Sequence, residues 1–181
     1  MINKLGFYQN ARQIPSPFCN QRPAGSEISL LVIHCISLPE GCYGGHEIES
    51  LFTGCLDSQA HPDFSSLEGL EVSAHCVIRR DGEIEQYVPF EKRAWHAGIS
   101  CFAGVEKCND YSIGIELEGT DKSAYTEEQY LSLAALTQKI QQRYPAINKQ
   151  RIVAHSEIAP GRKTDPGDGF DWVYYFTLLS D

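Results

Sequence analysis

The stretch YSIGIELEG, residues 111–119, alternates between large apolar and small or acidic side chains, which is the period-two pattern of a β-strand. One face carries Ile113, Ile115 and Leu117, and the other carries Gly114, Glu116 and Glu118. The pattern predicts a strand whose apolar face lies on the protein core. Glu116 on the second face either contacts solvent, which is the more common case, or lies in a cleft, and the periodicity favours neither.

Further strands are expected on both sides of this segment. Residues 73–88 (SAHCVIRRDGEIEQYV) hold Asp81 and Gly82 between two strand-like runs, which predicts a β-hairpin with a two-residue turn. The short apolar runs ISLLVI at 28–33 and RIVAH at 151–155 are rich in β-branched residues, which favours buried strands. Each of these two runs leads directly to a histidine.

Helices are expected between and after the strands. Thr126 and Gln129 have the spacing of a capping box, and the helix that they begin should end at Tyr144, because the next residue is proline. Residues 46–53 place apolar side chains on one helical face, and the aromatic segment 170–179 also favours a helix. Strands alternating with helices predict an α/β fold with a mixed central sheet flanked by helices.

The length of 181 residues suits one domain with a substantial hydrophobic core and leaves little room for two. The sequence shows no internal repeat, low-complexity tract or linker. We therefore expect a single domain over 1–181, with a core from about 28 to 178. Residues 10–27 are rich in Arg, Pro, Ser and Asn and should be irregular.

The net charge of −9 argues against binding to nucleic acid or to an anionic membrane, because both require clustered cations. The N-terminal residues contain no continuous apolar run, so we expect neither a signal peptide nor a membrane anchor, and a cytoplasmic location. The seven cysteines are odd in number and include no CxxC pair. Free thiols, mostly packed in the core, are expected rather than disulfides.

The segment HSEIAPGRKTDPG, residues 155–167, brings chemically active side chains into a stretch that proline and glycine keep from forming a long helix. His34 stands at the end of an earlier strand. Together with His155 and Asp165 it offers two imidazoles and one carboxylate, which is the ligand set of a catalytic zinc site with an open fourth position. The spacing alone is a weak signal. His34 and His155 can equally be hydrogen-bonded structural groups, Asp165 a turn residue and Lys163 a surface charge.

Other histidines are further candidates for the site. His96 follows Trp95 in AWHAG, and an aromatic side chain beside a small-residue loop suits a sugar or ligand wall; a structural role for His96 is equally favoured. His75 begins the hairpin and can point to the same cleft. Cys35 adjoins His34 and should therefore face the opposite side of the strand.

Four long stretches resemble the AmpD amidases, which are 1,6-anhydro-N-acetylmuramyl-L-alanine amidases of bacterial peptidoglycan recycling. They are VIHCISLPEGCYGG (32–45), SAHCVIRRDGEIEQYVPFEKRAWHAG (73–98), CNDYSIGIELEGTD (108–121) and HSEIAPGRKTDPG (155–167). The resemblance runs from about residue 10 to 178. It implies a fold like that of the peptidoglycan-recognition proteins and a cytoplasmic enzyme that acts on anhydro-muropeptides.

The resemblance also implies roles for individual residues. His34, His155 and Asp165 would bind Zn²⁺, Glu116 would accept the proton of the attacking water, and Lys163 would stabilise the transition state. Trp95, His96 and Lys107 are the expected substrate-binding residues. The acidic stem peptide requires some cation, for which Arg79, Arg93, Lys107 and Arg162 are candidates.

The sequence departs from the family pattern at two places. Cys35 stands where the family commonly has Asn, and Glu71 stands where a basic residue that contacts substrate is expected. These changes bear on specificity rather than on the reaction type. The alternatives are a non-catalytic peptidoglycan-recognition module, an amidase of intact cell wall and a zinc peptidase; a complete set of metal ligands argues against the first.

Overall fold

The computed structural model describes residues 1–179, so the last two residues of the expected domain, 180 and 181, lie outside the described part. A six-stranded sheet has the order β1-β5-β4-β9-β3-β10. Its strands are β1 (Arg12–Gln13), β3 (Leu30–Ile36), β4 (Cys76–Ile78), β5 (Ile84–Gln86), β9 (Ser112–Glu118) and β10 (Ile152–Ala154). All neighbouring strands are parallel except β4 and β5, so the predicted mixed sheet is confirmed.

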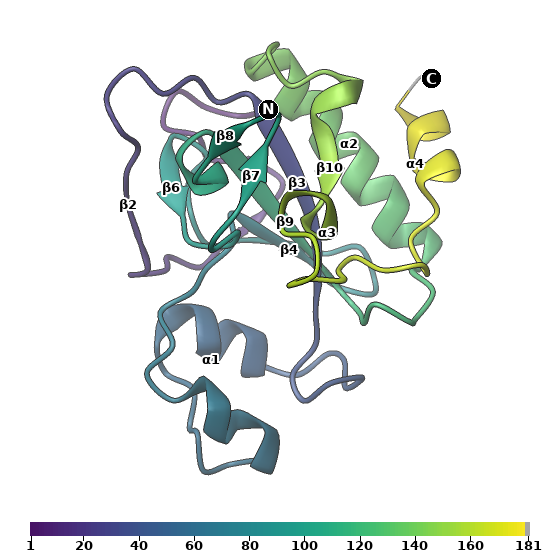
Figure 1. Cartoon of the computed structure of the whole chain (residues 1–181). Helices are drawn as coiled ribbons and strands as arrows, with labels where there is room; N and C mark the ends of the chain where they lie inside the picture. The colour runs from purple at the N-terminus through teal and green to yellow at the C-terminus, as the bar shows by residue number, and fades with distance from the viewer. Residues whose placement is uncertain (180–181) are drawn as a thin grey trace.

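One face of the sheet is covered by α2 (Glu127–Arg143), with α4 (Trp172–Leu178) on the same side (Figure 1). The main core lies between the sheet and these two helices, and it includes Leu31, Ile33, Ile113, Ile115, Leu117, Leu133, Leu136, Ile140 and Tyr175. The alternation predicted for residues 111–119 is thereby confirmed. The capping box is also present, because Thr126 Oγ1 accepts the N–H of Gln129 at 3.1 Å and Gln129 Oε1 accepts that of Thr126 at 3.1 Å.

The segment after β3 lies below the sheet in Figure 1 and contains α1 (Glu47–Thr53) and the 3₁₀ helix η1 (Pro62–Leu67). Ile48, Leu51 and Phe52 of α1 are buried in a second apolar cluster, as expected for residues 46–53. The remaining elements are short: β2 (Cys19–Gln21) paired with β6 (Lys92–Ala94), β7 (Cys101–Phe102) paired with β8 (Val105–Glu106), η2 (Cys108–Asp110), η3 (Lys149–Arg151) and α3 (His155–Ile158).

Three local predictions were wrong. The hairpin turn spans three residues rather than two, because Arg79 N–H donates to the carbonyl of Glu83 at 2.9 Å and Gly82 between them has φ +85°. β3 continues past His34 to Ile36, because it pairs with β9 along its whole length. Residues 10–27 are not wholly irregular, since β1 and β2 lie within them.

All seven cysteines are free thiols, but only Cys76 and Cys108 are buried, so the expectation that most pack in the core was wrong. Cys35 packs against the main core on the α2 side, opposite His34, as expected from strand alternation. Burial raises the pKa of the Cys35 thiol to about 12. Among residues 1–179, no helix combines the length and hydropathy needed to cross a bilayer.

Candidate metal centre and active site

His34 and Glu116 lie directly opposite each other on the neighbouring parallel strands β3 and β9. Paired residues of adjacent strands point to the same face, and this face is the one opposite α2. The Glu116 Oε1 atom lies 4.0 Å from His34 Nδ1. His34 is 1% exposed and Glu116 is 9% exposed, so Glu116 occupies a cleft rather than the solvent-facing position that is more common for such a residue.

His155 reaches the same place from the third parallel strand. β10 pairs with β3, with Ala154 opposite Ile33, and His155 follows as the first residue of α3. The chain then turns back, and the backbone N–H of Ser156 donates to the Asp165 carbonyl at 3.1 Å. The predicted break in this segment is present, because α3 ends after one turn.

The turn beyond Asp165 requires a glycine. Gly167 has φ +82°, and a Cβ atom at this position would lie 1.9 Å from the carbonyl oxygen of Asp121. This close approach fixes the loop that carries Asp165 against the turn after β9.

Three donor atoms meet at the carboxyl ends of the strands. The distances are 2.9 Å between His34 Nδ1 and His155 Nδ1, 3.1 Å from His34 Nδ1 to Asp165 Oδ2, and 2.9 Å from His155 Nδ1 to Asp165 Oδ2. Atoms so spaced can all lie about 2.0–2.2 Å from one point, as zinc ligands do. Two imidazole nitrogens and a carboxylate oxygen also form a donor set that zinc accepts with one position left open. The three side chains therefore fit a catalytic zinc ion, and their assignment as ligands stays a prediction.

Protonation states agree with ligation. Burial lowers the pKa of His34 to about 4, so its ring is neutral near pH 7 and carries a lone pair. Burial alone would raise the pKa of Asp165, but its contacts with the His155 and His34 rings outweigh this effect and hold that pKa below its ordinary value. A neutral imidazole and an ionised carboxylate are the forms that bind metals.

The Glu116 carboxyl group is chemically exceptional among the described residues. Its Oε2 atom is buried and, within residues 1–179, has no hydrogen-bond partner. Burial, with a smaller contribution from the charge of Asp165, raises the pKa of Glu116 well above its ordinary value, and the charge of Lys163 opposes this rise. An unpaired carboxyl oxygen with a raised pKa beside a cluster of metal-ligating atoms is suited to proton transfer.

These groups form the floor of an open pocket of about 260 Å³. Lys163 and Trp95 also line it, and Lys163 is exposed to solvent. Its apolar wall comes from α1, η1 and the segment that follows: Leu51, Phe52, Leu67, Leu70 and Val72. This wall was not predicted from the sequence. In the structure it is marked by Leu70, an apolar side chain that stays 43% exposed.

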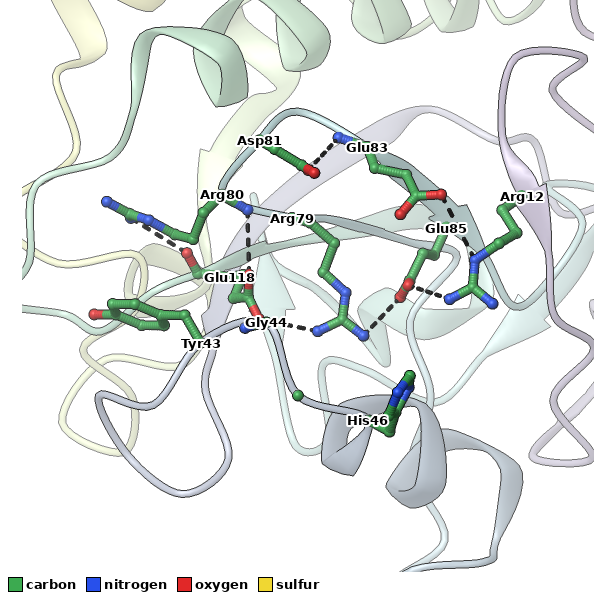
Figure 2. A pocket seen from close by; sticks show the side chains of 11 residues that line it. Arg12, Tyr43, Gly44, His46, Arg79, Arg80, Asp81, Glu83, Glu85 and Glu118 are labelled. Carbon is green, nitrogen blue, oxygen red and sulfur yellow. Dashed lines mark hydrogen bonds and ion pairs between the residues drawn. The ribbon is translucent and has the colours of Figure 1, made fainter.

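Lys107 lies outside this pocket, in a separate groove of about 510 Å³ that Arg162 also lines. Among the other candidate cations, Arg93 is paired with Asp110. Arg79 was a wrong candidate, because it is buried between Glu85 and Glu118 and lines a different hollow (Figure 2).

His75 and His96 lie differently with respect to the pocket. His75 does not line the pocket; its Nδ1 atom accepts the N–H of Gly114 at 3.0 Å, and its Nε2 atom lies 3.1 Å from Arg22 Nη2. His96 does line the pocket, but each of its ring nitrogens lies within hydrogen-bonding distance of a protein atom. Contact of His96 with substrate stays a prediction, as does that of Trp95 and Lys107.

Comparison with known proteins adds an independent line of evidence. The sequence profile of the N-acetylmuramoyl-L-alanine amidase family matches residues 24–168. The 1,6-anhydro-N-acetylmuramyl-L-alanine amidase AmpD of Citrobacter freundii is 57% identical over 180 residues, which cover 99% of this chain and 96% of that protein. A crystal structure of a selenomethionine AmpD derivative superposes with a TM-score of 0.96 at 56% identity, over 99% of both chains.

A more distant solved structure contains a ligand. It is the Escherichia coli amidase AmiD in complex with the substrate anhydro-N-acetylmuramic acid-L-Ala-D-gamma-Glu-L-Lys. Its TM-score is 0.62 at 31% identity, over 88% of this chain and 60% of that one. The similarity therefore extends to an amidase structure that holds an anhydro-muropeptide.

Proposed function

This chain belongs to the N-acetylmuramoyl-L-alanine amidase family, and we propose that it works with one zinc ion bound by His34, His155 and Asp165. It is a hydrolase of the amide bond between the lactyl group of 1,6-anhydro-N-acetylmuramic acid and L-alanine. The observation that carries the zinc proposal is the meeting of the three donor atoms, all within 4.8 Å of one another, beside the buried Glu116. When bound at such a site, zinc acts as a Lewis acid that acidifies water and polarises an amide carbonyl.

Glu116 is the proton carrier in this proposal. Its unpaired Oε2 atom accepts a proton from the attacking water and then returns it to the nitrogen of the departing L-alanine. The same carboxyl group can perform both transfers because its Oε2 atom is not engaged by another protein group, and burial raises its pKa above the ordinary value. Among the described residues, Asp165 is the one other acidic side chain that lines the pocket. It is already in contact with both histidines.

Lys163 stabilises the negative charge that develops on the carbonyl oxygen. Its side chain lines the pocket, and its charge is close enough to lower the pKa of Glu116. A preorganised cation at a developing oxyanion typically contributes about 10²–10³ in rate.

The substrate is bound by surfaces of different character. The apolar wall from Leu51 to Val72, together with Trp95, suits the ring and methyl groups of the anhydro sugar. Lys107 and Arg162 in the separate groove can meet the carboxylates of the stem peptide. Lys107 does so as a point charge, without the bidentate geometry of arginine.

We further propose that the reaction belongs to peptidoglycan recycling in the cytoplasm. An assay that compares soluble anhydro-muropeptide with intact sacculi tests this point. Preferential hydrolysis of sacculi, or recovery of the protein from the periplasmic fraction of cells, would contradict it.

The zinc proposal is tested with purified protein and 1,6-anhydro-muramyl tripeptide. Removal of metal by a chelator should abolish release of the peptide, and one equivalent of zinc should restore it. Full activity of the metal-free protein would exclude the mechanism. Binding without hydrolysis in the zinc-loaded protein would instead favour a peptidoglycan-recognition module.

A further inference from the structure

His34 and His155 each have one ring nitrogen, Nε2, that faces away from the donor cluster. Two consecutive residues, His96 and Ala97, contact these two nitrogens. His34 Nε2 lies 2.8 Å from His96 Nδ1. His155 Nε2 lies 3.1 Å from the carbonyl oxygen of Ala97. One short segment after β6 therefore meets both imidazoles from the side opposite to Asp165.

The contact with the Ala97 carbonyl determines which nitrogen of the His155 ring carries the proton. A carbonyl oxygen only accepts, so His155 Nε2 donates to Ala97 and its Nδ1 atom keeps a free lone pair. The contact between His34 and His96 joins two nitrogens, of which one must donate. If His34 Nδ1 provides a lone pair to a metal, then His34 Nε2 donates and His96 Nδ1 accepts.

The remaining nitrogen of His96 completes the chain of hydrogen bonds. His96 Nε2 lies 3.1 Å from the Ser112 hydroxyl oxygen, which can accept a hydrogen bond from the Nε2–H group. Ser112 is fully buried on β9. It precedes Glu116 on the same strand and points to the same face of the sheet. The neutral ring of His96 therefore has a donor site and an acceptor site that are both used within the protein.

The position of His96 is enforced by its surroundings. Gly114 faces the ring, and a Cβ atom at that position would lie 2.4 Å from His96 Cγ and Nδ1, so a side chain there would displace the imidazole. The Asn109 Oδ1 atom accepts the backbone N–H groups of both His96 and Ala97, at 3.2 and 2.8 Å. Arg162 Nη2 donates to the same Ala97 carbonyl, which anchors it further.

We propose that His96 and the Ala97 carbonyl form an acceptor clamp that fixes the tautomer and the orientation of His34 and His155. His96 is thus a positioning residue that acts through His34, and Gly114 and Asn109 hold the clamp in place. This inference rests on the proposed zinc site. Hydrogen-bond partners behind metal-binding histidines typically change metal affinity 10–100-fold when they are removed.

The clamp is tested by the zinc dissociation constant, measured by competition with a chromophoric chelator. His96→Leu should bind zinc about 10–100-fold more weakly than the wild type. His96→Asn places an amide oxygen near the position of Nδ1 and should recover most of the lost affinity. His46→Leu is the matched control, because His46 is exposed and lies in the separate hollow of Figure 2. Zinc affinity of His96→Leu within twofold of the wild type would overturn the clamp.

A second measurement uses the wild-type protein and does not depend on the folding of a variant. In the zinc-loaded protein with ¹⁵N-labelled histidine, the NMR signals of His96 should show a bare Nδ1 atom and a protonated Nε2 atom. A ring that fills a structural gap without accepting a hydrogen bond has no reason to adopt this tautomer. The opposite tautomer would overturn the clamp even if His96→Leu proved insoluble.

The two measurements separate the clamp from the proposed function. If the wild type bound no zinc, the zinc mechanism and the clamp would both be wrong. If the wild type bound zinc and was active, while His96→Leu bound zinc equally well, only the clamp would be wrong.

Discussion

At the scale of single residues, burial has opposite consequences for the two groups at the centre of the site. It lowers the pKa of His34 and raises that of Glu116, because in both cases the charged form is the one that loses solvation. The result is a neutral imidazole with a lone pair beside a carboxyl group that holds its proton more tightly than usual. A bound cation would stabilise the carboxylate form of Glu116 and so lower its pKa again.

The proton-carrier role of Glu116 predicts a variant that separates metal binding from turnover. Glu116→Ala should bind zinc like the wild type, because the three donor atoms are unchanged, and its kcat should fall about 10²–10⁴-fold. The matched control is Glu128→Ala, on the exposed side of α2, which should retain wild-type kcat. A near-normal kcat for Glu116→Ala would show that another group carries the proton.

The role of Lys163 predicts a smaller and purely kinetic defect. Lys163→Ala should lower kcat about 10²–10³-fold without changing the zinc dissociation constant, because the charge acts on the transition state. Lys139→Ala on α2, on the far side of the sheet, serves as the control for loss of one positive charge. If KM rose while kcat stayed constant, Lys163 would instead be a substrate-binding group.

Candidate residues for the site were identifiable from sequence by their type and their place in the chain. His34, His155 and Asp165 adjoin short apolar strands or a loop rich in proline and glycine, where functional groups are often found. The role of His96 was not predictable, because its partner His34 lies 62 residues away in the chain. No local pattern shows which nitrogen of a histidine meets which neighbour.

At the scale of elements, a buried charged network ties β4, β5 and β9 together. Arg79 donates to Glu118 and to Glu85, each at 3.0 Å (Figure 2). Glu118 Oε1 also accepts the backbone N–H of Gly44 at 2.7 Å, which holds the segment after β3 against the sheet. Because Glu118 follows Glu116 by two residues on β9, the network fixes the end of the strand that carries the proton carrier.

This network predicts a pH-dependent stability. Burial alone would raise the pKa of Glu85, but hydrogen bonds from Tyr87, Arg79 and Arg12 outweigh it and lower that pKa. A carboxyl group whose pKa is lower in the folded than in the unfolded protein stabilises the fold at pH values above the unfolded-state pKa of about 4.3. This stabilisation is lost as the pH falls toward the folded-state pKa. Glu85→Gln should therefore cost about 3–5 kcal/mol at pH 7 and show a shallower loss of stability on acidification, measured by urea unfolding.

A matched variant is available on the same hairpin. Glu83 is 51% exposed at its side chain and pairs with Arg12 at 3.7 Å, so Glu83→Gln should cost less than about 1 kcal/mol. An equal loss of unfolding free energy in the two variants would mean that the buried Arg79–Glu85 pair stabilises the fold no more than the exposed pair does.

Elements with a strong local signal were predicted well, and those defined by partners were not. The capping box at Thr126 located the start of α2, since the box depends only on residues within one turn. The predicted end of β3 and the predicted two-residue hairpin turn were wrong, because both features depend on pairing with another strand. The strands β2, β6, β7 and β8 have two or three residues each and carry too short a pattern to detect.

At the scale of the whole molecule, the site exists only through the order of the strands. β3 lies between β9 and β10, so Glu116 and His155 are brought to the two sides of His34. Asp165 then returns to His34 across 131 residues of sequence. Such convergence at the carboxyl ends of parallel strands follows from the topology, which residue patterns alone do not determine.

Because the ligands come from separated parts of the chain, zinc should stabilise the whole fold. Unfolding separates His34 from Asp165 and so destroys the site, and a ligand bound only to the native state at 100 times its dissociation constant contributes about 2.7 kcal/mol. For a protein of this size, that corresponds to a rise of about 5–11 °C in Tm between chelator-treated and zinc-loaded protein, measured by calorimetry. Glu116→Ala should keep this rise and Asp165→Ala should lose it, because Asp165 supplies a donor atom to the cluster and Glu116 does not. A Tm that did not respond to zinc in the wild type would show that the three side chains do not hold the ion together in the folded state.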